Sequence, residues 1–182
     1  MIAQANFGVK AGMNIGSPEY YGQELKNVVL PHMGAYMQFM LAEKFYLKPQ
    51  LLYSMKGGDF ESELQTYTEF YDLRLNYIDV PILLGYNIYD KLNIEVGPQI
   101  GYLLSAKSGW ISIEGGSDSR EDKIDRFKKT EISLSIGANY NIYRKVSIYL
   151  GYQKALSNIH KHNHSGHTKN SVFQFGLEYE LR

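Results

Sequence analysis

The chain has no cysteine among its 182 residues, so disulfide bonds, thiolate metal sites and cysteine catalysis are excluded together. Net charge is absent too, because 19 Lys and Arg residues balance 19 Asp and Glu residues. A nucleic-acid-binding protein usually carries a basic stripe or a strong net positive charge. We therefore expect no nucleic acid among the partners.

Long hydrophobic runs are also missing. The longest, from Val80 to Tyr86, is interrupted by Pro81 and Gly85. A membrane-spanning helix needs about 20 apolar residues, so helical spans are excluded. A membrane-spanning β-strand needs only ~9–11 residues, of which half face inward. A membrane barrel therefore remains compatible with the sequence.

The sequence does contain strict alternation of apolar and polar residues, clearest in a predicted β-hairpin that reaches residue 104. The face opposite the apolar one is rich in glycine and carries only scattered charges, whereas a soluble sandwich would carry Lys, Glu and Thr there. We therefore place the apolar face outward in lipid and the small, polar face inward. The outward residues of the second arm are Leu92, Ile94, Val96, Pro98, Ile100, Tyr102 and Leu104.

Eight segments share this alternation, and the connections between them alternate long and short. That arrangement is typical of up-and-down outer-membrane barrels. The sequence thus predicts an all-β fold, an eight-stranded antiparallel up-and-down transmembrane β-barrel, with residues 6–182 as one domain. The alternative is a soluble β-barrel that binds a small apolar ligand, which would turn the apolar faces inward. The predicted strands cover residues 7–15, 32–41, 45–56, 72–86, 92–104, 131–140, 146–153 and 173–181.

Two places disturb the alternation. Pro49 cannot donate to a ladder, so we expect a bulge there. Leu73, Leu75 and Tyr77 are out of phase with Ile78, which predicts either a bulge near Tyr77 or a strand that projects beyond the bilayer. Polar loops are expected between these strands, including residues 57–71.

Residues 1–5 end in a small-x-small pattern typical of signal-peptidase sites, with cleavage expected after Ala5. We therefore expect these residues to be the remnant of an export signal.

The hairpin also carries a family resemblance. Its arms read YIDVPILL at residues 77–84 and VGPQIGYLL at residues 96–104, and they resemble the hallmark strands of the PorT-like outer-membrane β-barrel family. The chain departs from that pattern at Asp79, where Glu is usual, and at Gly85, where Lys is usual. The resemblance implies the outer membrane of a Gram-negative bacterium as location, and it implies no chemistry.

An eight-stranded barrel is just wide enough to be filled by side chains. Charged residues on its inner face must therefore pair, because an isolated buried charge costs several kcal/mol. We predict a structural ion-pair network in the lumen, with a gated pathway for ions as the alternative. The predicted network consists of Lys10, Lys48, Lys56, Asp79, Glu95, Glu131 and Glu178.

The last long connection holds four of the five histidines: His160, His162, His164 and His167. Short His-rich tracts suit Zn²⁺, Ni²⁺ or Cu²⁺. The prediction is a weak divalent-metal site and no other cofactor, and the alternative is a solvated polar loop.

Lipid hydrolases and acyltransferases also use such barrels, with a Ser–His set near the outer rim. Ser17, His32, Ser157 and His160 are the candidates, but no motif relates them in space, so we predict that the chain is not an enzyme.

The predicted function is a structural, adhesive or surface-assembly role through external loops, without an open pore. We expect a monomer whose partners are outer-membrane lipid, including lipopolysaccharide, and an extracellular or envelope protein. Aromatic residues anchor interfaces well. The candidate partner-binding residues are Tyr20, Tyr21, Phe60, Tyr67, Phe70, Trp110 and Phe127.

Overall fold

The computed structural model describes residues 5–16, 19–20, 23–24, 26–64, 67–112, 118–122, 124–159 and 169–181. For residues 19–20, 23–24, 60–64, 67–71, 110–112 and 118–121 it describes the backbone. None of the helices in these ranges is long and apolar enough to span a membrane.

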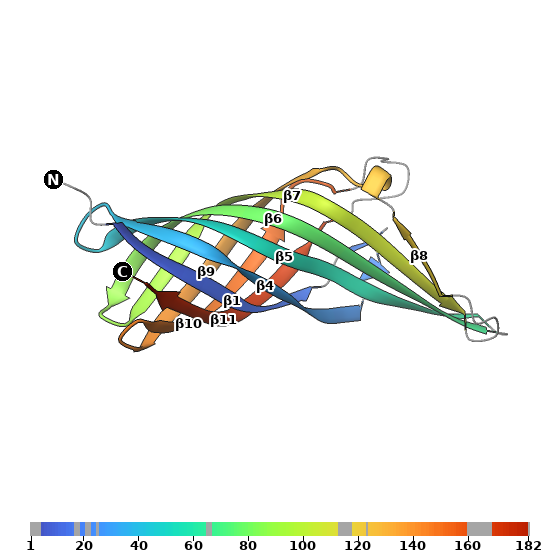
Figure 1. Ribbon diagram of the computed structural model, residues 1–182, viewed down its shortest axis with the longest axis horizontal. Helices are drawn as coiled ribbons and strands as arrows, with labels where there is room; N and C mark the ends of the chain where they lie inside the picture. The colour runs from blue at the N-terminus through green and yellow to red at the C-terminus, as the bar shows by residue number, and fades with distance from the viewer. Residues whose placement is uncertain are drawn as a thin grey trace.

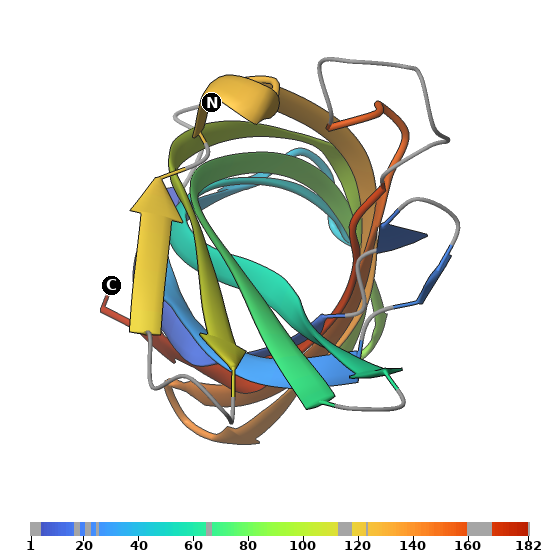
Figure 2. The same ribbon diagram turned by 90° about the vertical axis from the view of Figure 1, so that its right-hand side faces the viewer.

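Eight antiparallel strands close into a barrel, seen end-on in Figure 2. Each strand pairs with the next barrel strand along the chain, and the first pairs with the last, from Gly8 opposite Glu180 to Gly16 opposite Val172. The predicted fold class is confirmed. The barrel strands are β1 (Ala5–Gly16), β4 (Lys26–Met40), β5 (Phe45–Leu64), β6 (Tyr67–Tyr89), β7 (Leu92–Ser112), β9 (Thr130–Tyr143), β10 (Val146–Ala155) and β11 (Ser171–Glu180).

The connections differ at the two ends of the barrel. Residues 41–44, 90–91 and 144–145 form short turns at the end where both termini lie (Figure 1). The opposite end carries the small hairpin of β2 (Glu19–Tyr20) and β3 (Gln23–Glu24), the strand β8 (Asp118–Asp122) and the 3-10 helix η1 (Ile124–Arg126). The predicted alternation of long and short connections is therefore present.

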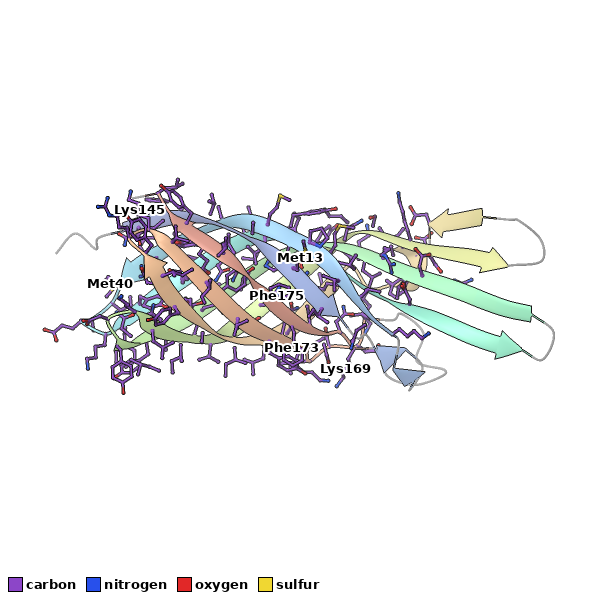
Figure 3. The ribbon with its side chains drawn as sticks, turned by 90° about the horizontal axis from the view of Figure 1, so that it is seen from below. Met13, Met40, Lys145, Lys169, Phe173 and Phe175 are labelled. Atoms are coloured by element: carbon purple, nitrogen blue, oxygen red, sulfur yellow. The ribbon has the colours of Figure 1, made fainter. Side chains whose placement is uncertain are left out.

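Apolar side chains cover the outside of the barrel. Strand β10 has 10 residues, and a tilted strand of that length spans roughly 23 Å, close to the apolar band of an outer membrane. Aromatic residues flank the aliphatic band, with Phe45 and Tyr140 near the short turns and Tyr102 and Phe173 toward the other end. Figure 3 shows Met13 and Phe175 on the wall between Lys145 and Lys169, which lie toward opposite ends. Exposed aliphatic residues of the band include Val9, Met33, Leu51, Ile82, Val96, Leu134, Ile136, Ile148 and Leu177.

The predicted bulge at Pro49 is wrong. Pro49 lies opposite Ile82, and the pairing resumes at Leu52 opposite Asp79 without a change of register. The proline therefore interrupts the ladder without an extra residue in the strand.

The disturbance near Tyr77 is real, but the extra residue lies in the neighbouring strand. Asn76 is opposite Ser105 and Tyr77 is opposite Leu103, so β7 gains one residue at this point while β6 keeps its alternation. Leu73 and Leu75 thus point inward. They form an apolar core toward the long-connection end of the lumen, together with Tyr77, Leu103, Ala106, Phe127 and Ile159.

Much of the predicted loop at residues 57–71 is strand. Three barrel strands, β5, β6 and β7, continue past the barrel as a sheet that β8 joins, visible on the right of Figure 1. The last pair of β4 with β5 is Lys26 opposite Asp59, and β9 stops pairing with β7 at Thr130. Beyond these points β5, β6, β7 and β8 form what we call the extension, which consists of residues 59–64, 67–72, 108–112 and 118–122.

Candidate functional site

Two ion clusters occupy the inside of the barrel. The lower ion cluster, which lies nearer the short turns, consists of Lys10, Lys48, Glu95 and Glu178. Lys48 Nζ lies 2.9 Å from Glu95 Oε1 and 2.7 Å from Glu178 Oε2. Lys10 Nζ lies 3.5 Å from the other oxygen of Glu178. All four side chains are buried, and two cations balance two anions.

Neutral groups complete the lower ion cluster. The Tyr46 hydroxyl and the Asn139 amide donate hydrogen bonds to Glu95 Oε1 at 2.8 Å and 2.7 Å. Glu95 therefore receives three donors when Lys48 is included, which compensates for the loss of water around a buried carboxylate.

The upper ion cluster lies nearer the long-connection end. Lys56 Nζ is 3.0 Å from Asp79 Oδ2 and 3.0 Å from Glu131 Oε1. Gln153 donates to Glu131 Oε1 at 3.1 Å, and Asn170 donates to its other oxygen. One ammonium group thus bridges two carboxylates. All seven residues predicted for the lumen network are therefore buried, and each joins one of the two ion clusters.

Tyrosines are the lumen residues that the sequence analysis missed. Lys10 Nζ lies 3.6 Å from the centre of the Tyr149 ring, Lys48 Nζ 4.5 Å from that of Tyr36 and Lys56 Nζ 4.6 Å from that of Tyr77. Each buried lysine therefore contacts an aromatic face as well as a carboxylate. The sequence pattern could have located them, because these tyrosines occupy inward positions of the alternation.

Glycines make room for these rings. Tyr36 lies opposite Gly8, and Tyr46 lies opposite Gly85. A Cβ atom on Gly8 would lie 2.2 Å from the Tyr36 ring, and one on Gly85 would lie 2.1 Å from the Tyr46 ring. The inward glycines therefore allow large aromatic rings to lie flat across the lumen wall.

Hydrogen-bonded side chains also occupy the lumen between the two ion clusters. The His32 ring bonds the Tyr149 hydroxyl, and Asn14 donates to Ser54 at 2.9 Å and accepts from Gln174 at 2.9 Å. His32 is 1% exposed, so its predicted position near the rim is wrong. It occupies an inward position of β4, where its ring is buried against Tyr149.

Of the other catalytic candidates, Ser157 lies in the described part of the chain, and its hydrogen bonds are to the Ile132 backbone and not to His32. The Ser157 hydroxyl accepts a hydrogen bond from the Ile132 backbone N–H at 2.9 Å, outside the lumen. Ser17 and His160 lie outside the described residues.

The predicted metal ligands His160, His162, His164 and His167 also lie outside the described residues. Within the described part of the chain, no group of three or more histidine and acidic side chains is arranged to hold a metal ion.

The predicted partner-binding aromatics lie in several parts of the molecule. Phe127 is 2% exposed and packs in the apolar core, so its predicted exposure in a loop is wrong. Phe60, Tyr67, Phe70 and Trp110 belong to strands of the extension. Tyr20 belongs to β2, and Tyr21 lies outside the described residues.

A recess of about 990 Å³ opens between the short turns at the other end of the barrel. Glu43, Lys44, Asp90 and Lys91 are among its lining residues. Its walls carry equal numbers of these acidic and basic groups, which gives the recess no charge preference.

Solved structures share this fold. The attachment invasion locus protein Ail of Yersinia pestis, in complex with the heparin analogue sucrose octasulfate, has a TM-score of 0.59 and 13% identity over 98% of this chain and 99% of that chain. Neisserial surface protein A has a TM-score of 0.57 and 16% identity over 97% of this chain and 98% of that chain. No curated protein matches the chain in sequence.

The family comparison covers most of the chain. The outer membrane protein beta-barrel domain family matches residues 2–161, which include β1 to β10. The apolar outer face, the closed ladder and the buried ion pairs all agree with that match. The chain belongs to the outer membrane protein beta-barrel domain family and is a protein of the outer membrane.

Proposed function

We propose that the barrel anchors the extension at the cell surface, where the extension binds an extracellular or envelope partner in adhesion or surface assembly. The observation that carries this proposal is the continuation of β5, β6 and β7 past the barrel as a sheet (Figure 1). Short turns face the periplasm in outer-membrane barrels, and longer connections face outward. By that rule the extension lies outside the cell.

The lumen supports an anchoring role over transport. Lys48 and Lys56 join carboxylates from several strands, and all of these groups are buried. A conducting path requires ions to enter and leave, whereas removal of a buried partner leaves an uncompensated charge. The proposed barrel is therefore non-conducting. The proposal further takes the chain to act as a monomer and through binding rather than catalysis.

The pairing of β6 with β7 offers a physical reason for the two motifs of the PorT-like resemblance. Asp79 of the first motif lies opposite Gly101 of the second, and a Cβ atom on Gly101 would lie 2.6 Å from Asp79 Oδ1. The acidic side chain of one strand thus occupies the space left by the glycine of the other. This coupling supports placing the chain in the PorT-like branch.

Basic residues around the outer rim suit the phosphate groups of lipopolysaccharide. Lys107, Arg126, Lys128, Lys129 and Lys154 are exposed near the ends of the strands that border the long connections. Lipid phosphate is thus a partner for the rim, while the extension remains available for another molecule.

The test is a chain without the tip of the β5–β6 hairpin. Asp59 lies opposite Asp72, so residues 60–71 can be replaced by Asn-Gly, which favours a tight hairpin turn. Cells that display the shortened chain should lose attachment to the surface or partner that cells with the full chain bind. Heat-modifiable gel mobility should show that the barrel still folds.

The matched control removes material from the opposite end. Replacing Glu43 and Lys44 by Asn-Gly shortens no strand and leaves the extension intact. Attachment that persists with the shortened hairpin would overturn the proposed function, as would conductance steps from the full chain in planar bilayers.

A further inference from the structure

The extension has a free edge along β5. Up to Asp59 this edge pairs with β4, whose last pair on it is Lys26 opposite Asp59. From residue 60 to 64 the strand pairs with β6 on its other side, and no described strand pairs with it on this side. Unpaired backbone N–H and C=O groups on such an edge accept an additional strand.

The extension is also strongly acidic. Residues 59–72 contain five acidic residues and no Lys or Arg, and residues 118–122 contain three acidic residues and one Arg. The whole chain has no net charge, so the remainder is correspondingly basic. This concentration of negative charge favours a cationic partner and disfavours a polyanion, in contrast to the polysulfated ligand of the Ail complex.

The register adds an apolar feature. Phe60 is opposite Tyr71, and Tyr71 is opposite Trp110, so three aromatic residues form one row across three strands. By the period of a strand, Phe60, Ser62 and Leu64 share one face of β5, while Glu61 and Glu63 share the other. Acidic residues therefore alternate with Phe60, Ser62 and Leu64 along the register of the edge.

We propose that the free edge of β5, residues 60–64, binds an extended peptide segment in which basic residues alternate with apolar ones. The peptide pairs with β5 on the same side as β4, beyond the pair of Lys26 with Asp59, and so adds a strand to the extension. Its basic residues take the register positions opposite Glu61 and Glu63, as Lys26 lies opposite Asp59 in the last native pair. This inference rests on the proposed function, because it names the chemistry of the partner that the extension binds.

Length and charge both limit the affinity. An edge of five residues offers few backbone hydrogen bonds. Salt also weakens interactions between charges at the surface, and at physiological salt the Debye length is about 8 Å. We therefore expect reversible binding that weakens as the salt concentration rises.

The experiment uses the full chain in detergent micelles and a fluorescein-labelled peptide in which four lysines alternate with four valines. A second peptide has the same composition but places the four lysines before the four valines. A third keeps the alternation with N-methylated valines, which cannot donate backbone hydrogen bonds. Fluorescence anisotropy measures the three dissociation constants at low and high salt.

The alternating peptide should bind at least about tenfold more tightly than the other two, because only it matches both charge and backbone pairing. The double variant Glu61→Gln/Glu63→Gln should weaken its binding about tenfold. The control variant Glu43→Gln/Asp90→Gln, at exposed sites by the short turns, should leave binding unchanged.

Equal binding of all three peptides, or equal binding by the two double variants, would overturn the inference. The proposed function fails separately. If the shortened hairpin abolishes cell attachment while the alternating peptide does not bind the full chain, the extension binds another kind of partner and only this inference is wrong.

Discussion

The barrel and the extension share strands β5 and β6, but the two regions differ in how these strands are paired and charged. In the barrel, β5 and β6 have both edges paired, an apolar outer face and an inner face whose charges are paired. In the extension, β5 no longer pairs with β4, and the same two strands carry an excess of acidic residues. A closed ladder is required in lipid, where an unpaired backbone group costs several kcal/mol, and it is dispensable in water.

This difference separates stability from recognition. Substitutions inside the barrel should change the free energy of unfolding, whereas substitutions in the extension should mainly change binding. The predictions below test that separation, from the largest expected effect on stability to the smallest.

Lys48→Met should have the largest effect. It leaves Glu95 and Glu178 without their shared cation in a buried site, and loss of one partner of a buried ion pair costs about 3–5 kcal/mol. Urea titration in phospholipid vesicles, followed by heat-modifiable gel mobility, measures the change. The exposed Lys44→Met should change it by less than about 0.5 kcal/mol. Equal effects would mean that the lumen is hydrated.

Ile136→Lys tests the apolar outer face. Ile136 is exposed on β9 opposite Val96, within the aliphatic band, and a lysine at the middle of the bilayer costs about 2–4 kcal/mol in a membrane barrel. The same titration measures it. Leu156→Lys, just past the end of β10, is the control and should cost no more than about 1 kcal/mol. If Ile136→Lys were harmless, its side chain would not face lipid.

Gly85→Ala tests the packing of the rings across the lumen wall. The added Cβ atom would lie 2.1 Å from the Tyr46 ring, and overpacking of this kind costs about 1–3 kcal/mol. Gly151→Ala is the matched control in β10, because its nearest neighbouring atom lies 3.6 Å away. We expect only the first variant to unfold at lower urea concentration, and identical midpoints would contradict the role assigned to the glycine.

The sequence predicted the barrel because lipid imposes a period of two on every strand. Alternation placed Lys48, Glu95 and Glu178 inward, and the requirement that buried charges pair predicted a network. It did not predict which carboxylate each lysine would bind, since that depends on stagger between strands distant in the chain.

The extension was harder to predict because no lipid acts on it. Residues 57–71 read as a polar loop, since their charges resemble those of a solvated segment, although they form most of a paired hairpin. Phe127 was assigned to the surface for a similar reason. Its burial depends on Leu73, Leu75 and Ile159, and on Leu103 and Ala106, which the bulge in β7 brings to the same side.

Arg74→Met should have the smallest effect, although its ion pair has the shortest distance of those considered. Arg74 Nη1 lies 2.6 Å from Asp59 Oδ1, where the extension begins, but the two side chains are 28% and 45% exposed. Exposed pairs contribute about 0–1 kcal/mol and are screened by salt. Urea titration should therefore show a change several times smaller than that of Lys48→Met, and in 1 M salt the change should vanish. If Arg74→Met destabilised the chain as much as Lys48→Met, the extension would be part of the folding unit of the barrel, and stability and recognition would not be separate.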